Sequence, residues 1–232
     1  MSPEDRLVPY QASALPPGPW LVLAPHPDDE SVGMGGTLAL GAQRGLEIKL
    51  VLVTDGEQGG EPWVRRQEAL CATKVLGLPA PEFWNLPDRE VFQHLGMLAS
   101  NLKRLKVQRF KTIFVPSFQE FHPDHRAVTL GTLSFLQEVA WSGEVWLYEI
   151  SRQGEVNRLV VIDQVRARKS QAIACYQSQL AQAPYQELAQ ALDWLRAYSL
   201  SPRGVRHAEG FLAAKVEALI EEWGRRLRTY FS

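Results

Sequence analysis

The sequence predicts a single α/β domain with a mostly parallel sheet and helices on both faces. Short apolar runs, such as 20–24 and 48–54, are typical of strands that are buried on both faces of a sheet. Helix-like segments alternate with these runs, which is the order of a doubly wound sheet. The chain of 232 residues has no internal repeat, low-complexity tract or convincing linker. One domain is therefore expected over residues 20–232.

The elements can be predicted in chain order. Residues 1–19 are expected to form an extended leader, because three prolines between positions 16 and 19 block regular structure. The next elements are a strand over 20–24, a glycine-rich turn at Gly33, Gly35 and Gly36, a helix over 37–44, a strand over 48–54, helices over 63–76 and 91–105, a strand over 112–115 and a helix over 123–139. After Gly143 the order changes. Two strands at a sheet edge, 144–150 and 159–162, precede helices near 163–176, 186–198 and 207–223.

Composition and charge exclude several classes of function. The net charge is −1 and basic residues are mixed with acidic ones, which argues against a nucleic-acid-binding protein. No apolar run approaches the roughly 18 to 20 residues that cross a membrane. The first 20 residues carry acids and prolines where a signal peptide carries bases and an apolar stretch. A cytoplasmic protein is therefore expected, and the sequence leaves open whether it forms a homo-oligomer.

The two cysteines, Cys71 and Cys175, lie in segments that are predicted to be helical and are far apart in the sequence. Two buried free thiols are expected in preference to a disulfide between them. No CxxC motif is present, so a zinc site made of cysteines is excluded.

Two short clusters carry the groups that suit chemistry. The first is HPDDE at residues 26–30, and the second is HPDH at residues 122–125. Each cluster follows a buried apolar strand and precedes a helix. Because ligands bind outside the carboxyl ends of the strands in open α/β sheets, the two clusters are expected to converge on one crevice.

Imidazole and carboxylate groups together are the usual ligands of a catalytic zinc, which takes three protein ligands and keeps one open position. His26 and Asp29 are three residues apart, as are His122 and His125, so the members of each pair can face the same side. Four potential ligands exceed the three that are needed. Asp28 is placed to act as the general base. Of the second histidine pair, one would bind metal and the other would face the developing charge on the substrate.

Other motifs are absent or incomplete. The turn at residues 33–36 lacks the third glycine of a dinucleotide-binding loop, and the chain has no GxxxxGK, HExxH or GxSxG sequence. His94 and His207 stand alone and are interpreted as structural residues.

The sequence resembles the LmbE/PIG-L family of zinc deacetylases, which includes N-acetylglucosaminyl-phosphatidylinositol de-N-acetylases and the deacetylases of mycothiol and bacillithiol synthesis. The resemblance extends from about residue 20 to residue 219. Its most specific marks are APHPDDESVGMGGTLA at 24–39 and HPDH at 122–125. Weaker marks are VTDGEQGG at 53–60, RRQE at 65–68, LPD at 86–88, the run from Asp163 through Lys169 to YQSQ at 176–179, and AEGF at 208–211.

The resemblance implies a Rossmann-like fold, one zinc ion per chain and a small-molecule N-acetyl sugar as substrate. It implies that His26, Asp29 and His125 hold the zinc, that Asp28 is the general base, and that His122, oriented by Asp124, stabilises the oxyanion or protonates the leaving amine. Two departures stand out. Some relatives have a tyrosine just before the second motif, where this chain has Ser117–Phe121, and relatives often have histidine in place of Tyr176.

The predicted activity is hydrolysis of an N-acetylated amino sugar of the GlcNAc type, giving acetate and a free amine. Two alternatives remain: an amidase for a bulkier glycoside or thiol conjugate, and a metal-binding or carbohydrate-binding protein without turnover. Asp55, Trp63 and Arg65 are predicted to contact the substrate, because their glycine-rich loop follows a buried strand, and the family resemblance favours Arg65, which begins the Arg-x-x-Glu pattern that ends at Glu68. The alternative is that Trp63 packs at the start of a helix and that one of Arg65 and Arg66 is merely solvated.

Overall fold

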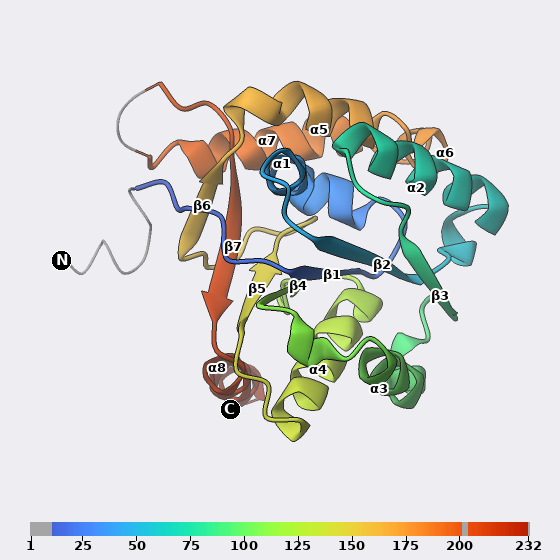
Figure 1. The fold of residues 1–232 in the computed structure, drawn as a ribbon, viewed down its shortest axis with the longest axis vertical. Coiled ribbons are helices and arrows are strands. Elements are labelled where there is room, and N and C mark those ends of the chain that lie inside the picture. Colours follow the sequence, from blue (N-terminus) through green and yellow to red (C-terminus); the bar gives the residue numbers. More distant parts are fainter. Residues whose placement is uncertain (1–10, 201–203, 232) are drawn as a thin grey trace.

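The computed structural model describes residues 11–200 and 204–231, and its centre is a seven-stranded sheet with the order β3-β2-β1-β4-β5-β7-β6 (Figure 1). The strands are β1 Trp20–Ala24, β2 Ile48–Thr54, β3 Glu82–Leu86, β4 Thr112–Pro116, β5 Glu144–Tyr148, β6 Arg158–Val161 and β7 Ala208–Ala214. Strands β1 to β5 pair in parallel, whereas β7 pairs antiparallel with both β5 and β6. The predicted mostly parallel sheet is confirmed.

Helices cover both faces of the sheet (Figure 1). One face carries α1 Asp29–Gln43, α2 Pro62–Leu76, α5 Arg166–Ile173, α6 Gln177–Leu180 and α7 Tyr185–Ala197, and the other carries α3 Leu95–Arg104, α4 Pro123–Glu138 and α8 Val216–Phe231. Short 3-10 helices in the connections are η2 Glu57–Gly59, η3 Val91–His94, η4 Val107–Arg109 and η5 Asp163–Val165. None of the helices described here is long and apolar enough to cross a membrane.

Strand β1 explains why an uninterrupted apolar run predicts this sheet. Trp20, Val22 and Ala24 belong to the apolar cluster under α1 and α2, while Leu21 and Leu23 belong to the cluster under α3 and α4. All five side chains are fully buried. A strand that is covered on both faces must be apolar at every position, and not only at alternate ones.

The predicted helix over 207–223 is wrong in its first half. Residues 208–214 form β7, which inserts between β5 and β6, and the helix α8 begins only at Val216. The segment AEGFLAA has little intrinsic preference for a strand, so its pairing with two neighbouring strands decides its conformation. The two strands that were predicted to form the edge together are consequently not neighbours.

The glycines that were predicted to form a turn lie inside α1 instead. A Cβ atom at Gly33 would lie 2.6 Å from the carbonyl oxygen of Glu149, and one at Gly36 would lie 2.6 Å from Cγ2 of Ile162. The glycines therefore allow α1 to pack closely against the end of β5 and the segment after β6. The helix is kinked at Met34, whose φ of −148° is not helical.

Two further elements differ from the prediction. The structure has a strand, β3, that was not predicted. The helix expected over 91–105 is divided into the 3-10 helix η3 and the α-helix α3. The N-terminal leader lies partly outside the described residues. Within its described part, the backbone N–H of Ser13 donates to the carbonyl of Leu159 and no helix or strand is formed.

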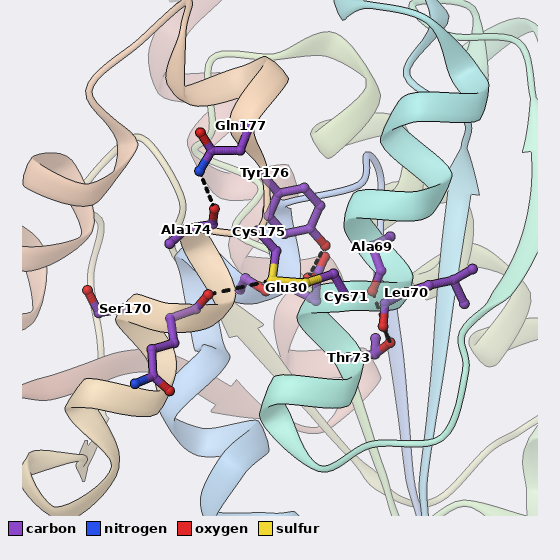
Figure 2. Close-up of a disulfide and its surroundings, with 12 residues drawn as sticks. Glu30, Ala69, Leu70, Cys71, Thr73, Ser170, Ala174, Cys175, Tyr176 and Gln177 are labelled. Carbon is purple, nitrogen blue, oxygen red and sulfur yellow. Dashed lines mark hydrogen bonds between the residues drawn. A yellow bond between two sulfur atoms is a disulfide. The ribbon is translucent and has the colours of Figure 1, made fainter.

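Cys71 and Cys175 form a disulfide, so the prediction of two buried free thiols is wrong (Figure 2). Cys71 is exposed on α2, and Cys175 is half-buried just after α5. The two helices pack side by side, which brings the Cα atoms to 5.9 Å, within the usual range for a disulfide. The neighbouring Tyr176 points into the domain, where its hydroxyl donates to Glu30 (Figure 2).

Because the disulfide closes a chain segment of 104 residues, we expect Cys71→Ser to lower the free energy of unfolding by about 2–4 kcal/mol. Denaturant titration measures this loss. Cys175→Ser should cost the same amount, and the double variant should cost no more than either single variant. Additive losses, or two reactive thiols in the unreduced protein, would contradict the cross-link.

Candidate active site at the carboxyl ends of the parallel strands

The two histidine clusters meet at one edge of the sheet. Strands β1 and β4 are parallel neighbours, and His26 and His122 follow their carboxyl ends. The ring centroids of His26 and His122 are 4.5 Å apart, and those of His26 and His125 are 5.3 Å apart. Segments separated by almost one hundred residues thus share one site.

Three potential ligand atoms form a nearly regular triangle. Nδ1 of His26 lies 3.1 Å from Oδ2 of Asp29, Nε2 of His125 lies 3.2 Å from the same oxygen, and the two nitrogens are 3.3 Å apart. A tetrahedral zinc with bonds of about 2.0–2.1 Å has ligand atoms about 3.3 Å apart. The triangle therefore has the size and the chemical composition of one face of a zinc site.

The outer atoms of the two imidazoles face further carboxylates. Nε2 of His26 lies 3.1 Å from Oδ1 of Asp88 and 3.3 Å from Oδ2 of Asp124. Nδ1 of His125 lies 3.8 Å from Oε2 of Glu120. The acceptors at Nε2 of His26 can fix its ring orientation, as they do for histidines that bind metals, whereas Nδ1 of His125 has no hydrogen-bond partner among the described residues. His122 belongs to two further groupings of potential ligand atoms within 4.8 Å of one another, one with His26 and His125 and the other with His26, Asp88 and Asp124.

The pKa shifts follow from the concentration of buried charge. Burial would lower the pKa of His125, but the Asp29 carboxylate raises it to about 9. Burial and the adjacent Asp29 raise the pKa of Asp28 to about 8, although Arg65 and His26 oppose this shift. These carboxylates need positive charge nearby. A divalent cation held by the triangle would supply it, so the electrostatics also fit a metal centre.

Asp28 has a strained backbone and a defined environment. Its φ of 129° lies in a region that residues other than glycine rarely adopt. Arg65 is buried, donates to the carbonyls of Gly56 and Pro27, and has Nη2 3.6 Å from Oδ2 of Asp28. The guanidinium therefore fixes the loop that carries Asp28. Nε of Arg65 has no hydrogen-bond partner among the described residues.

His122 is half-buried and caps α4. Its Nδ1 accepts a hydrogen bond from the backbone N–H of Asp124, so the proton of the neutral ring is on Nε2. Burial and the neighbouring His26 and His125 lower the pKa of His122 to about 4. At neutral pH the ring is an uncharged donor. The carboxylate of Asp124 accepts from the backbone N–H groups of Arg89 and Val91 and lies 3.3 Å from Nε2 of His26. Orientation of His122 by Asp124 stays a prediction.

A cavity of about 490 Å³ opens over these residues, within the usual size range of small-molecule sites. All five parallel strands contribute to it through the segments at their carboxyl ends, with His26, Gln58, Asp88, His122 and Ser151. Its other lining residues are Asp28, Asp29, Val32, Gly59, Arg65, Arg89, Phe121, Pro123, His125, Ile150, Gln179, Gln182 and Tyr185.

Comparison with known proteins gives the family. The sequence model of PIG-L, described as GlcNAc-PI de-N-acetylase, matches residues 21–136, which is half of the 232-residue chain. The chain belongs to the PIG-L family. The matched region contains both histidine clusters, and the predicted family is thereby confirmed.

Individual relatives of this PIG-L-family chain are distant. The probable N-acetyl-alpha-D-glucosaminyl L-malate deacetylase 2 of Bacillus subtilis (strain 168) is 29% identical over 123 residues, which are 46% of this chain and 55% of that protein. The chain thus matches only about half the length of this relative. The diacetylchitobiose deacetylase of Thermococcus kodakarensis is 24% identical over 215 residues, 82% of this chain and 80% of that protein. Among solved structures, the conserved protein TT1542 from Thermus thermophilus has a TM-score of 0.72 and 28% identity, with 83% of this chain and 93% of that chain covered.

The structure also locates the two departures from the pattern of PIG-L relatives. Ser117–Phe121 contributes no phenol, but Tyr185 at the start of α7 lines the cavity. Tyr176 is buried and lies outside the lining; its hydroxyl donates to Glu30 at 2.6 Å. This hydrogen bond connects the turn after α5 to the start of α1.

The three predicted substrate contacts are separated. Arg65 lines the main cavity, whereas Asp55 and Trp63 line a neighbouring pocket of about 110 Å³. Trp63 is 69% exposed, so it is not a packing residue of the core. Substrate binding by these residues stays a prediction. His94 pairs with Glu90 and His207 with Asp163, and neither histidine lines the cavity.

Sequence reasoning missed Asp88, Glu120 and Tyr185 as members of the site. In the sequence, Asp88 is only the last residue of the weakly specific LPD motif, and the strand before it was not predicted. Had β3 been recognised, Asp88 would have been expected at the same edge of the sheet as the two clusters. No local signal in the sequence indicates Tyr185.

The contact between Asp88 and His26 generates a test. We expect Asp88→Ala to weaken zinc binding by about 10- to 100-fold, because His26 loses the acceptor that orients its ring. Competition with a chromogenic chelator measures the affinity. Asp163→Ala is the matched control, since its histidine partner, His207, does not line the cavity. Unchanged affinity in Asp88→Ala would contradict this role.

Proposed function

We propose that this protein is a zinc-dependent hydrolase that removes the acetyl group from an N-acetylated amino sugar of the GlcNAc type. The observation that carries the proposal is the triangle of His26, Asp29 and His125 beside Asp28 on the wall of a cavity. The names of the relatives support the same substrate class, since they include deacetylases of a glucosaminyl malate and of diacetylchitobiose. One zinc ion per chain is expected.

A zinc ion held by the triangle would lower the pKa of a bound water toward about 7 and polarise the acetyl carbonyl. Asp28 is placed to accept a proton from the attacking water, because its carboxylate is adjacent to the triangle and lines the cavity. A zinc ion held by the neighbouring Asp29 would place positive charge close to Asp28 and favour its ionised form, which is the form that can act as a base.

The neutral ring of His122 is suited to stabilise the negative charge that develops on the substrate. Its Nε2–H can donate to the carbonyl oxygen as negative charge develops there, in the manner of an oxyanion-hole donor. Addition of water to the carbonyl carbon is followed by cleavage of the C–N bond. The proton taken up by Asp28 passes to the leaving nitrogen, so that acetate and a free amine are formed.

Two other functions are compatible with parts of the site. An amidase for a bulkier glycoside or thiol conjugate would use the same residues, and only the outer cavity would differ. A metal-binding or carbohydrate-binding protein without turnover would have no use for Asp28, whose strained, buried position is costly to maintain. The presence of Asp28 therefore favours an enzyme.

Acetate release from zinc-loaded protein tests the activity directly. We expect turnover of N-acetylglucosamine glycosides, with loss on removal of zinc and recovery on its return. N-acetyl amino acids serve as the comparison substrates, because their hydrolysis alone would indicate an amidase of another kind. Tight binding of the sugars without acetate release would support the non-catalytic alternative.

Variants of the two adjacent aspartates separate base from ligand. Asp28→Asn should retain zinc and lose kcat by about 10²- to 10⁴-fold, because an amide cannot accept the proton. Asp29→Asn should instead weaken zinc binding at least about tenfold, since it removes a charged ligand atom. Zinc content by elemental analysis and kcat by acetate release distinguish the two effects. Equal loss of zinc in both variants would refute this division of roles.

His122→Ala should retain zinc and lose kcat by about 10²- to 10³-fold, as expected for a donor that acts mainly in the transition state. His207→Ala is the control, because its ring is bonded to Asp163 and does not line the cavity. Its kcat/KM should stay within about twofold of the wild type. Loss of zinc from His122→Ala would show that this histidine is a ligand.

A further inference from the structure

Arg89 lies beside the site in an unusual backbone conformation. Its φ is 67°, in the left-handed region that favours glycine. The backbone is held there from both sides. The N–H of Arg89 donates to Asp124 at 2.6 Å, and the side chain of the preceding Asp88 contacts His26 and accepts from the N–H of Gln58. These contacts fix the position from which the side chain of Arg89 extends.

The guanidinium of Arg89 is a cationic group of the cavity lining that has no hydrogen-bond or ion-pair partner among the described residues. The other arginine of the cavity lining, Arg65, is buried and bonded to two carbonyls. Arg126 and Arg152 do not line the cavity, and they donate to the carbonyls of Phe121 and Gln119. Within the part of the chain that the structure describes, no hydrogen bond or ion pair engages the exposed guanidinium of Arg89.

The neighbouring acidic residues do not neutralise Arg89. Glu90 is directed to His94, with 3.7 Å between its Oε2 and Nε2 of the imidazole. Asp88 and Asp124 use their carboxylates on His26 and on backbone N–H groups. The exposed end of Arg89 is therefore free to meet an anion from solvent.

The location of Arg89 selects which part of a substrate it can contact. The reacting groups, Asp28 and the triangle, are buried, whereas Arg89 is exposed and lines the same cavity. In a GlcNAc glycoside, the glycosidic carbon is next to the carbon that bears the acetamide. The group attached through the glycosidic bond is therefore close to the reacting amide, within the same cavity that Arg89 lines.

We propose that Arg89 is a specificity-determining residue that binds a carboxylate on the aglycone of an N-acetylglucosaminide. This inference rests on the proposed deacetylase function and narrows its substrate to anionic conjugates. The planar guanidinium matches a carboxylate in a bidentate arrangement. Without this cation, the aspartates of the inner cavity would disfavour a negatively charged substrate.

The experiment compares an N-acetylglucosaminide of a dicarboxylate such as malate with its neutral dimethyl ester and with diacetylchitobiose. The variants are Arg89→Gly, in which glycine tolerates the backbone conformation, and Arg89→Gln, which keeps most of the side-chain length. For the dicarboxylate we expect KM to rise about tenfold in both variants with kcat within twofold, as for the loss of one charge-assisted contact. For both neutral substrates, kcat/KM should stay within twofold.

Arg44→Ala is the charge-matched control, because Arg44 is exposed at the C-terminal end of α1, far from the cavity. It should leave all three substrates unaffected. Equal effects of the Arg89 variants on charged and neutral substrates, or no effect on either, would overturn the proposal.

A binding measurement separates this proposal from the deacetylase assignment. Calorimetric titration of the zinc-loaded proteins with the dicarboxylate glycoside should give about tenfold weaker binding to Arg89→Gly than to the wild type. If no substrate is hydrolysed but this difference appears, the anion site stands and the deacetylase function fails. Hydrolysis with equal binding to both proteins would instead overturn the anion site and leave the deacetylase function standing.

Discussion

The arrangement of the site depends on the contacts that the imidazole of His26 makes through both of its ring nitrogens. One ring nitrogen faces Asp29 and His125, and the other faces Asp88 and Asp124. The ring therefore joins groups that follow β1, β3 and β4 into a single buried unit. Isolated carboxylates could not remain ionised at such a depth, because burial disfavours their charged form. Positive charge at the centre, from the imidazoles or from a bound cation, is what allows these acids to lie together.

The rest of the domain holds the two halves of this unit in register. Parallel pairing of β1 and β4 brings both clusters to the same sheet edge, and α1 can lie close to the sheet because glycine occupies its contact positions. Tyr176 and the disulfide connect the opposite wall of the cavity to α1 and α2. The site is thus fixed from the sheet below and from the helical layer beside it. Such support is needed because a metal centre tolerates little displacement of its ligands.

The parts of the fold that the sequence predicted are those governed by local pattern. Fully buried strands such as β1 are predictable because every position must be apolar, and the histidine clusters lie just after β1 and β4. The missed features depend on contacts between distant segments. The residues of β7 become a strand only between β5 and β6, and Cys71 meets Cys175 only because α2 packs beside α5. Asp88 was missed for the same reason, since its position becomes meaningful only when β3 joins the sheet.

The separation of the ligands along the chain links the cation to folding itself. His26 and His125 are 99 positions apart, so an unfolded chain holds their nitrogens far from each other. A cation that binds this triangle would bind the folded protein almost exclusively. Each tenfold increase in free cation above the dissociation constant would then add about 1.4 kcal/mol to the stability of the native state. The availability of the metal would thereby regulate the amount of folded protein as well as its activity, and a chain deprived of the ion would be the form most exposed to proteolysis.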